Sequence, residues 1–484
     1  MRLGIDFGTT RTVVAACDRG NTPIVSFDTP EGGLEAHIPT LAATDGHAWR
    51  YGWEAAERIE DDRWSVVRSF KRALSGEHAT LDSALRVGPH EVKVIELLTG
   101  FLTHLREQLA VSNAPGAHTI DDELVAMVAV PAGASSAQRL MTLAAFRAAG
   151  FEVEGLLNEP SAAGVEYAHR YRKSFNSVRR DVLVYDLGGG TFDASRVRME
   201  GGVHRVTGHA GLSDLGGTDV DHALLRLALD ALGIPFEPRA SWLERAREAK
   251  ESIKPNTRNV LVDLDVGEAK IAVTDLYEVV SPLLDRTLVA LEPLANEAGL
   301  AGVYVVGGGS ELPLVARRLK DRFGRRVKRS AYASGAVAVG LALALAGEGP
   351  ELHEIMGRAF GVFREARSGA DVTFDTLLAP GQASDDEVVR RYRAVHNIGH
   401  LRFVECERID HGVPEGVVTP YADVRIAYDA GLVGEDLDAF PVARVGDGPI
   451  IEERYRLGSD GAVHVTVANL STGATLFDHA QLRA

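Results

Sequence analysis

Two glycine-rich segments, 4–10 and 185–193, carry the residue types that could hold a phosphate group. Each follows a short apolar run and places an aspartate, Asp6 or Asp186, just ahead of its glycines. Glycine amides can approach phosphate oxygens closely because no Cβ stands in the way. One carboxylate at each strand end could also hold a hydrated Mg²⁺. The pair therefore predicts two phosphate-binding hairpins that face each other across a cleft.

One such turn would be weak evidence, because a glycine-rich hairpin that binds no nucleotide has the same sequence pattern. The occurrence of two, each with its own aspartate, favours a nucleotide site. The sequence contains no G-x-x-x-x-G-K-[ST] loop. The lysine-bearing phosphate cradle of P-loop enzymes is therefore excluded.

The elements that must position these turns alternate between strand and helix over residues 1–346, which is typical of layered α/β domains. Residues 124–130 form a buried-strand pattern, and 137–149 a helix pattern that stops at a glycine. Residues 303–306 predict another buried strand that runs into a third glycine-rich turn, followed by a helix over 312–323. The front part of the chain therefore predicts one nucleotide-binding domain.

The pattern changes after the glycine- and proline-containing segment that begins at Gly347. A linker is expected over 347–356, and short alternating segments then predict an all-β domain over 357–484. The clearest hairpin pairs 451–457 with 463–467 through a turn at 459–461.

The composition of the chain argues against several classes of partner and of site. The net charge of −16 over 484 residues argues against nucleic acid and anionic membranes as partners. Two cysteines cannot build a disulfide framework or a cysteine-rich zinc site. No signal peptide is expected ahead of the first strand, and the apolar run 333–346 is shorter than the roughly 20 residues of a bilayer span. A cytoplasmic location is expected.

Seven blocks of the sequence stand in the order and approximate spacing found in the DnaK-type, seventy-kilodalton heat-shock chaperones, which the chain resembles. The blocks are 4–10, 70–74, 130–132 with 137–139, 158–163, 186–193, 215–219 and 306–313. The resemblance covers residues 1–346 and continues more faintly in the tail, at 360–362 and 458–472.

The resemblance implies a two-lobed, actin-like ATPase domain of ribonuclease-H-like units, followed by a smaller β-sandwich domain that resembles the substrate-binding domain of the family. ATP or ADP would lie at the bottom of the cleft with Mg²⁺, and K⁺ is a further expected cation. The catalytic positions would be Lys71, Glu159, Asp186 and Thr191. The metal positions would be Asp6, Asp186 and Asp193.

In this resemblance Lys71 positions the attacking water and stabilises charge on the γ-phosphate, with Glu159 as its polar partner. Phosphoryl transfer asks mainly for positioning and electrostatic stabilisation, so this residue set would suffice. Without the motif, a solvated surface lysine would be the simpler interpretation of Lys71.

Backbone and side-chain contacts to the nucleotide are also implied. By this resemblance, the residues that would contact the nucleotide are Gly8, Thr9, Thr10, Gly188, Gly189, Gly190, Gly216, Gly217, Lys250, Gly307, Gly308 and Ser310.

The chain departs from the family pattern around the base and ribose. Glu311 stands where an arginine usually stacks on adenine, and Arg247 and Lys254 stand where an acidic residue and a serine are typical. Gly307, Gly308 and Ser310 still permit close approach of the base and ribose. We therefore expect ATP binding with altered affinity or base selectivity.

The linker segment 351–356 is only loosely similar to the aspartate-leucine run of the family, and a C-terminal helical lid like that of the family is not expected. Without a lid, a bound peptide is expected to exchange rapidly in both nucleotide states.

The leading interpretation is a lidless, ATP-hydrolysing chaperone that binds unfolded or apolar peptide segments as a monomer, with J-domain and nucleotide-exchange partners. A small-molecule kinase on the same fold is one alternative, although sugar kinases generally lack the blocks at 130–132 and 158–160 and the β tail. A nucleotide-sensing scaffold that binds ATP without turnover is another, supported by the changed residues near the base. Fold alone does not decide among them.

Overall fold

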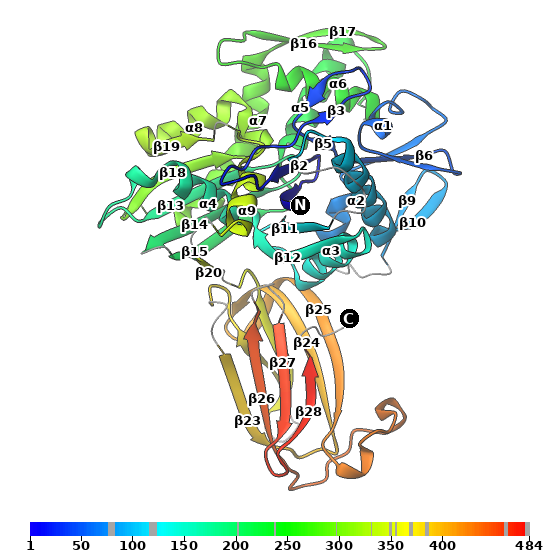
Figure 1. Cartoon of the computed structure of the whole chain (residues 1–484), viewed down its shortest axis with the longest axis vertical. Helices are drawn as coiled ribbons and strands as arrows, with labels where there is room; N and C mark the ends of the chain where they lie inside the picture. The colour runs from blue at the N-terminus through cyan, green and yellow to red at the C-terminus, as the bar shows by residue number, and fades with distance from the viewer. Residues whose placement is uncertain are drawn as a thin grey trace. The chain divides into compact units, whose positions relative to one another are not determined.

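The computed structural model describes residues 1–75, 83–115, 123–200, 203–236, 239–296, 298–330, 332–347, 351–353, 356–366, 371–382, 387–458 and 463–479 (Figure 1). These residues form two compact units. The first contains the described residues of 1–74, 81–133 and 142–352. The second contains Ser75, residues 134–141 and the described residues from His353 onward.

Among the described residues, the first unit contains two large sheets beside several smaller ones, and the strands of the first large sheet are joined in the order β12-β11-β1-β2-β5. These strands are β1 (Arg2–Phe7), β2 (Arg11–Ala16), β5 (Ile38–Pro39), β11 (Leu124–Val130) and β12 (Phe151–Asn158). β1 pairs with β2 as an antiparallel hairpin and with β11 in parallel, and β11 and β12 are also parallel. The first glycine-rich turn is therefore the hairpin loop at the centre of this sheet.

The second sheet repeats this connectivity, in the order β19-β18-β13-β14-β15-β20. Its strands are β13 (Asp181–Leu187), β14 (Phe192–Glu200), β15 (Val203–Leu212), β18 (Leu300–Val306), β19 (Val327–Arg329) and β20 (Glu351–His353). β13 and β14 form the antiparallel hairpin, and β18 runs parallel to β13. Each sheet thus places one glycine-rich hairpin loop beside a parallel strand, as expected of two ribonuclease-H-like lobes.

Two buried helices, α4 (Glu159–Arg170) and α9 (Ala336–Leu345), pack against each other and against the two sheets. A Cβ added to Gly340 of α9 would lie 1.8 Å from the carbonyl oxygen of Ala162, so the two backbones touch at this glycine. α9 is the predicted apolar run, and none of the helices described has the length and apolar character needed to cross a membrane.

The remaining elements of the first unit surround this core. The helices are α1 (Gly52–Ala56), α2 (Val94–Val111), α3 (Ser136–Ala148), which is shared with the second unit, α5 (Gly217–Leu232), α6 (Ala240–Glu251), α7 (Val273–Leu291) and α8 (Pro313–Phe323). The short strands are β3 (Phe27–Asp28), β4 (Leu34–Glu35), β6 (Leu41–Thr44), β7 (Trp49–Tyr51), β8 (Ser65–Arg68), β9 (Ala84–Val87), β10 (His90–Lys93), β16 (Asn259–Leu264) and β17 (Gly267–Ala272).

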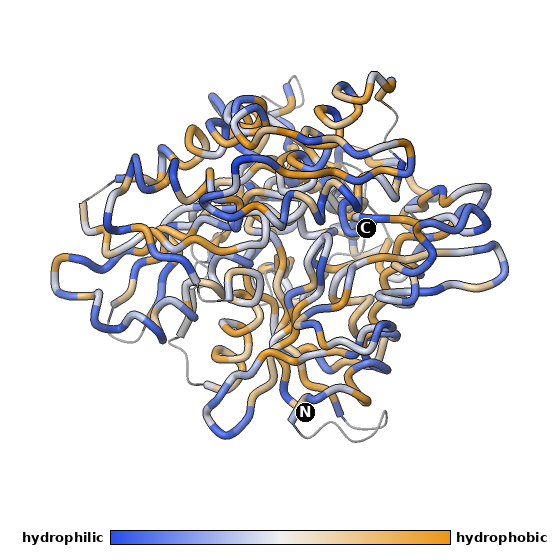
Figure 2. The backbone as a smooth tube through the Cα atoms, turned by 90° about the horizontal axis from the view of Figure 1, so that it is seen from above, coloured by the Kyte–Doolittle hydropathy of each residue, from blue (hydrophilic) through white to orange (hydrophobic). Residues whose placement is uncertain are grey.

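The tail contains two four-stranded antiparallel sheets, with the orders β22-β21-β24-β25 and β23-β26-β27-β28. The strands are β21 (Ala359–Ala366), β22 (Asp371–Leu378), β23 (Glu387–Arg393), β24 (Ile398–Asp410), β25 (Val413–Ala427), β26 (Ile450–Leu457), β27 (Val463–Asn469) and β28 (Ala474–His479). Phe360, Phe403 and Tyr455 join their shared apolar core. Figure 2 colours the backbone of the whole chain by hydropathy, and hydrophobic and hydrophilic stretches follow each other along it.

The predicted hairpin of the tail is present as β26 and β27, while its turn at 459–461 lies outside the described residues. Of the predicted linker, 348–350 and 354–355 also lie outside them. The described part, β20, is an edge strand of the second sheet, next to β15. The division between the compact units falls inside the predicted linker, after Leu352.

Candidate functional site

The two glycine-rich hairpin loops meet in the first unit. A Cβ added to Gly189 would lie 2.4 Å from Thr10 Oγ1, and one added to Gly190 would lie 2.8 Å from Thr9 Cγ2. Only residues without a side chain permit this approach. The loops line a cavity of about 100 Å³, to which Gly8, Thr9, Thr10 and Gly188–Thr191 all contribute.

Two aspartates, the partly buried Asp6 and the buried Asp186, line this cavity, and the buried Asp193 lies beside it. Burial and the nearby Glu159 raise the pKa of Asp6 and of Asp193 to about 7, although Lys71 acts in the opposite direction on both. Burial, Glu159 and the other two aspartates raise the pKa of Asp186 well above its usual range. Removing carboxylates from water and placing them close together disfavours their charged forms. A bound cation would reverse that balance.

This donor set fits Mg²⁺, which prefers oxygen ligands. Among the described residues, no three acidic, histidine or cysteine side chains form a cluster able to hold a metal directly. Because Mg²⁺ usually keeps several of its waters, carboxylates spaced this way suit an ion held through water. Thr191 donates a hydrogen bond to Asp193, which lowers the pKa of that carboxyl and fixes its position.

Lys71 is buried at the base of the first lobe, with only 3% of its surface exposed. Its ammonium group donates to the carbonyl oxygen of Phe7 and lies 3.2 Å from Glu159 Oε1. The interpretation of Lys71 as a solvated surface lysine is therefore wrong. The ion pair places one buried cation beside the aspartates, where it could stabilise a phosphate.

Arg72 belongs to the site, although the sequence pattern did not single it out. Its Nη2 donates to the carbonyl oxygen of Gly190 at 2.5 Å and lies 3.9 Å from Asp219. Arg72 follows Lys71 in the first lobe, whereas Gly190 and Asp219 belong to the second. The guanidinium therefore ties the second phosphate turn to the first lobe, a contact that no spacing along the chain reveals.

Gly216 and Gly217 pack against the second glycine-rich turn. The amide of Gly217 donates to the carbonyl oxygen of Gly188 at 2.9 Å, and a Cβ on Gly216 would lie 2.7 Å from the carbonyl oxygen of Gly189. Lys250 Nζ lies 2.6 Å from Asp221 and donates to the carbonyl oxygen of Gly217 at 3.1 Å. Gly217 and Lys250 line the cavity, whereas Gly216 lies behind the turn.

The third glycine-rich turn follows β18 and also faces the site. Gly307 has a φ of +83°, and a Cβ there would lie 2.3 Å from Asp186 Oδ1. Gly307 and Gly308 line the cavity. Ser310 is buried and donates from Oγ to the carbonyl oxygen of Gly307 at 2.6 Å. We find Ser310 holding the turn in shape rather than facing the cavity.

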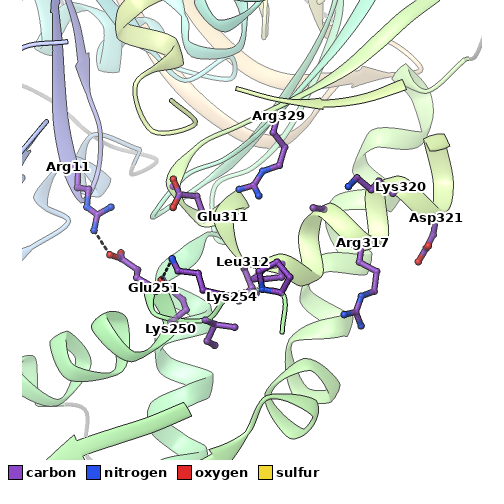
Figure 3. A pocket seen from close by; sticks show the side chains of 16 residues that line it. Arg11, Lys250, Glu251, Lys254, Glu311, Leu312, Arg317, Lys320, Asp321 and Arg329 are labelled. Carbon is purple, nitrogen blue, oxygen red and sulfur yellow. Dashed lines mark hydrogen bonds and ion pairs between the residues drawn. The ribbon is translucent and has the colours of Figure 1, made fainter. Parts of the chain in front are cut away.

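A larger cavity of about 550 Å³ adjoins this phosphate cavity and shares Arg11, Lys250 and Glu251 with it (Figure 3). Glu311 and Lys254 line it, while Arg247 lines the phosphate cavity. Arg11 of β2 pairs with Glu251 of α6 at 2.6 Å, which links the two lobes over the site. The pairing joins segments that lie far apart along the chain, so no local pattern of residues indicates it.

Comparison with known proteins places these features in a family. A family model described as Hsp70 protein matches residues 96–351. A chaperone protein HscA homolog of Polynucleobacter asymbioticus is 32% identical over 369 residues, covering 70% of this chain and 57% of the relative. The chaperone protein HscA of Escherichia coli O6:H1 is 31% identical over 364 residues, covering 71% of this chain and 57% of the relative.

The chain thus spans less than two thirds of the length of these relatives. Its duplicated hairpin sheets and its β-sheet tail confirm the predicted fold class, an actin-like ATPase region followed by a β domain. The family match covers more than half of the chain. On these grounds the chain belongs to the Hsp70 family.

Proposed function

We propose that the chain is an ATP-binding and ATP-hydrolysing molecular chaperone that binds unfolded or apolar polypeptide segments. The observation that carries this proposal is the meeting of the two glycine-rich turns beside the ion pair of the buried Lys71 with Glu159 and beside the three aspartates. These are the parts that phosphoryl transfer requires: amide donors, a cation and acidic anchors.

The chain's own residues would act mainly by positioning. The amides of the turns at 8–10 and 188–191 would hold the β- and γ-phosphates. Lys71 would position the attacking water and stabilise charge that develops on the γ-phosphate, with Glu159 as the polar partner near that water. Asp6 and Asp186 would hold Mg²⁺, with Asp193 supporting them; when bound, the ion neutralises phosphate charge. K⁺ would be a further cation at the phosphates.

Client binding is assigned to the β domain by resemblance. The domain has its own core, built by two sheets, so it can present a surface independently of the nucleotide site. J-domain and nucleotide-exchange proteins would be its regulatory partners, and the chain would work as a monomer. We also propose that the nucleotide-binding domain ends at 346, that residues 347–356 form a linker, and that the β domain begins at 357.

Single-turnover hydrolysis of ATP by the intact chain tests the proposal. We expect slow hydrolysis that an unfolded apolar peptide accelerates and that Lys71→Ala reduces at least a hundredfold, because the variant removes the buried cation. Lys270→Ala, at an exposed position of β17, is the matched control and should hydrolyse ATP at the wild-type rate. Equal rates in wild type and Lys71→Ala would contradict the assignment.

The nucleotide-sensing scaffold remains the second candidate because Glu311 and the cations near it change the nucleoside end of the site. Tight ATP binding without turnover, unaffected by peptide, would favour it. The family match does not support the small-molecule kinase.

A further inference from the structure

The 550 Å³ cavity has the size of a ligand site and continues directly from the phosphate cavity. Its wall comes from the end of α6 and the turn after it, the glycine-rich turn after β18, α8 and β19 (Figure 3). A nucleotide whose 5′-phosphates lie between the two turns would place its sugar and base in this larger cavity. We call it the nucleoside cavity.

Cations dominate the wall of the nucleoside cavity. The basic residues are Arg11, Lys250, Lys254, Arg317, Lys320 and Arg329, and the acidic residues are Glu251, Glu311 and Asp321. Ion pairs neutralise two of the cations, since Arg11 pairs with Glu251 and Lys250 pairs with Asp221, both at 2.6 Å. The other four basic residues face only Glu311 and Asp321 as remaining acidic residues of the wall.

These four cations have little compensation within the chain. Among the residues that the structure describes, Lys254 Nζ contacts only the carbonyl oxygen of Glu251, at 3.4 Å, and the Arg317 guanidinium lies over the ring of Tyr277. In the described part of the chain, Lys320 and Arg329 form no ion pair. Figure 3 shows the Arg329 side chain descending into the space between Glu311 and Lys320.

The four side chains are exposed, so water solvates them in the free chain, but their concentration on one wall of a chain with a net charge of −16 favours an anionic ligand there. The triphosphate of ATP would lie at the glycine turns, and adenosine itself is uncharged, so ATP leaves these cations unused. Lysine and arginine are the usual partners of phosphate groups. A second phosphate, attached to the nucleoside, would satisfy them.

We propose that the nucleoside cavity binds a phosphate carried on the sugar, so that the chain prefers nucleotides phosphorylated at the 2′ or 3′ position as well as at the 5′ position. This inference rests on the proposed function, because the 5′-phosphates must occupy the glycine turns.

Calorimetric titration with ADP and with ADP bearing a 3′-phosphate, in parallel with the 2′-phosphate isomer, tests the preference. We expect the intact chain to bind at least one isomer about tenfold more tightly than ADP at low salt, with the ratio falling as salt is raised. In the double variant Lys320→Gln/Arg329→Gln the ratio should fall to about two. The matched double variant Arg325→Gln/Lys328→Gln changes the same charge on the same segment, outside the cavity wall, and should keep the tenfold ratio.

Equal binding of ADP and both phosphorylated isomers by the intact chain would overturn the inference and leave the proposed function standing. A preference that survives Lys320→Gln/Arg329→Gln would overturn it too, because the extra phosphate would then lie elsewhere. Failure of all three nucleotides to bind would overturn the proposed function itself. Thermal unfolding of each variant confirms that it is folded.

Discussion

At the scale of single residues, the glycines of the phosphate turns let the two turns come close because glycine has no side chain. Gly189→Ala would place a methyl group 2.4 Å from Thr10 Oγ1, so the two turns would have to separate. We expect ATP affinity to fall about tenfold, or about 1.4 kcal/mol. Gly133→Ala is the control, since a Cβ there meets nothing within 4 Å. Titration of both variants with ATP checks this, and equal affinities would contradict the geometry.

His37 gives the nucleotide-binding unit a stability that depends on pH. Burial, with Arg11 and Arg247 nearby, lowers its pKa from 6.5 to about 3. The unfolded chain therefore binds one more proton than the folded chain between these values, and folding is weakened as pH falls below about 6.5. His37 alone lowers the free energy of unfolding by up to about 1.4 kcal/mol for each pH unit below 6.5.

We expect His37→Asn to flatten that dependence relative to wild type between pH 6.5 and 5. Denaturant unfolding at several pH values measures the free energy of unfolding of both proteins. The contributions of the aspartates cancel when the variant is compared with wild type. An unchanged slope in His37→Asn would show that the imidazole is protonated in the folded chain.

The residues that could be predicted from the sequence are those whose role follows from a local pattern. Asp6, Asp186 and the turn glycines stand beside strands whose apolar runs are visible in the sequence. Arg72 and Arg11 could not be assigned, because each acts on a segment of the other lobe. Nothing in the spacing of residues reports which distant chain segments become neighbours.

At the scale of elements, α6 connects the second lobe to the first through ion pairs. Arg68 of β8 lies 2.6 Å from Glu244 with both side chains mostly buried, while Arg245 lies 2.9 Å from Glu60 with both largely exposed. We expect Arg68→Gln to speed nucleotide release about tenfold and Arg245→Gln less than about threefold, because exposed pairs contribute little. Stopped-flow release of a fluorescent nucleotide measures both, and equal effects would refute this ranking.

Elements with strong periodicity were placed well from the sequence. β11 was predicted over the residues that the structure shows, and α3 within one residue at each end. The long tail strands β24 and β25 were not individually placed, because bulges break the alternation of their side chains. Their pairing depends on the shared core of the two sheets rather than on local pattern.

At the scale of the whole molecule, two compact units with separate cores imply two unfolding steps. In the tail, Glu453 is fully buried and accepts hydrogen bonds from Tyr392 and Tyr455 while pairing with Arg364. Glu453→Gln would leave the mostly buried Arg364 with less of its compensating charge, which costs about 3 kcal/mol.

Differential scanning calorimetry separates the two steps. Mg-ATP should raise only the transition of the nucleotide-binding unit, because a ligand stabilises the unit that binds it. Glu453→Gln should lower only the transition of the tail, and Arg391→Gln, whose side chain is largely exposed, should leave both near their wild-type temperatures. A single transition that both ATP and Glu453→Gln displace would mean that the two units unfold together. Nucleotide binding would then stabilise the tail as well as the nucleotide-binding unit.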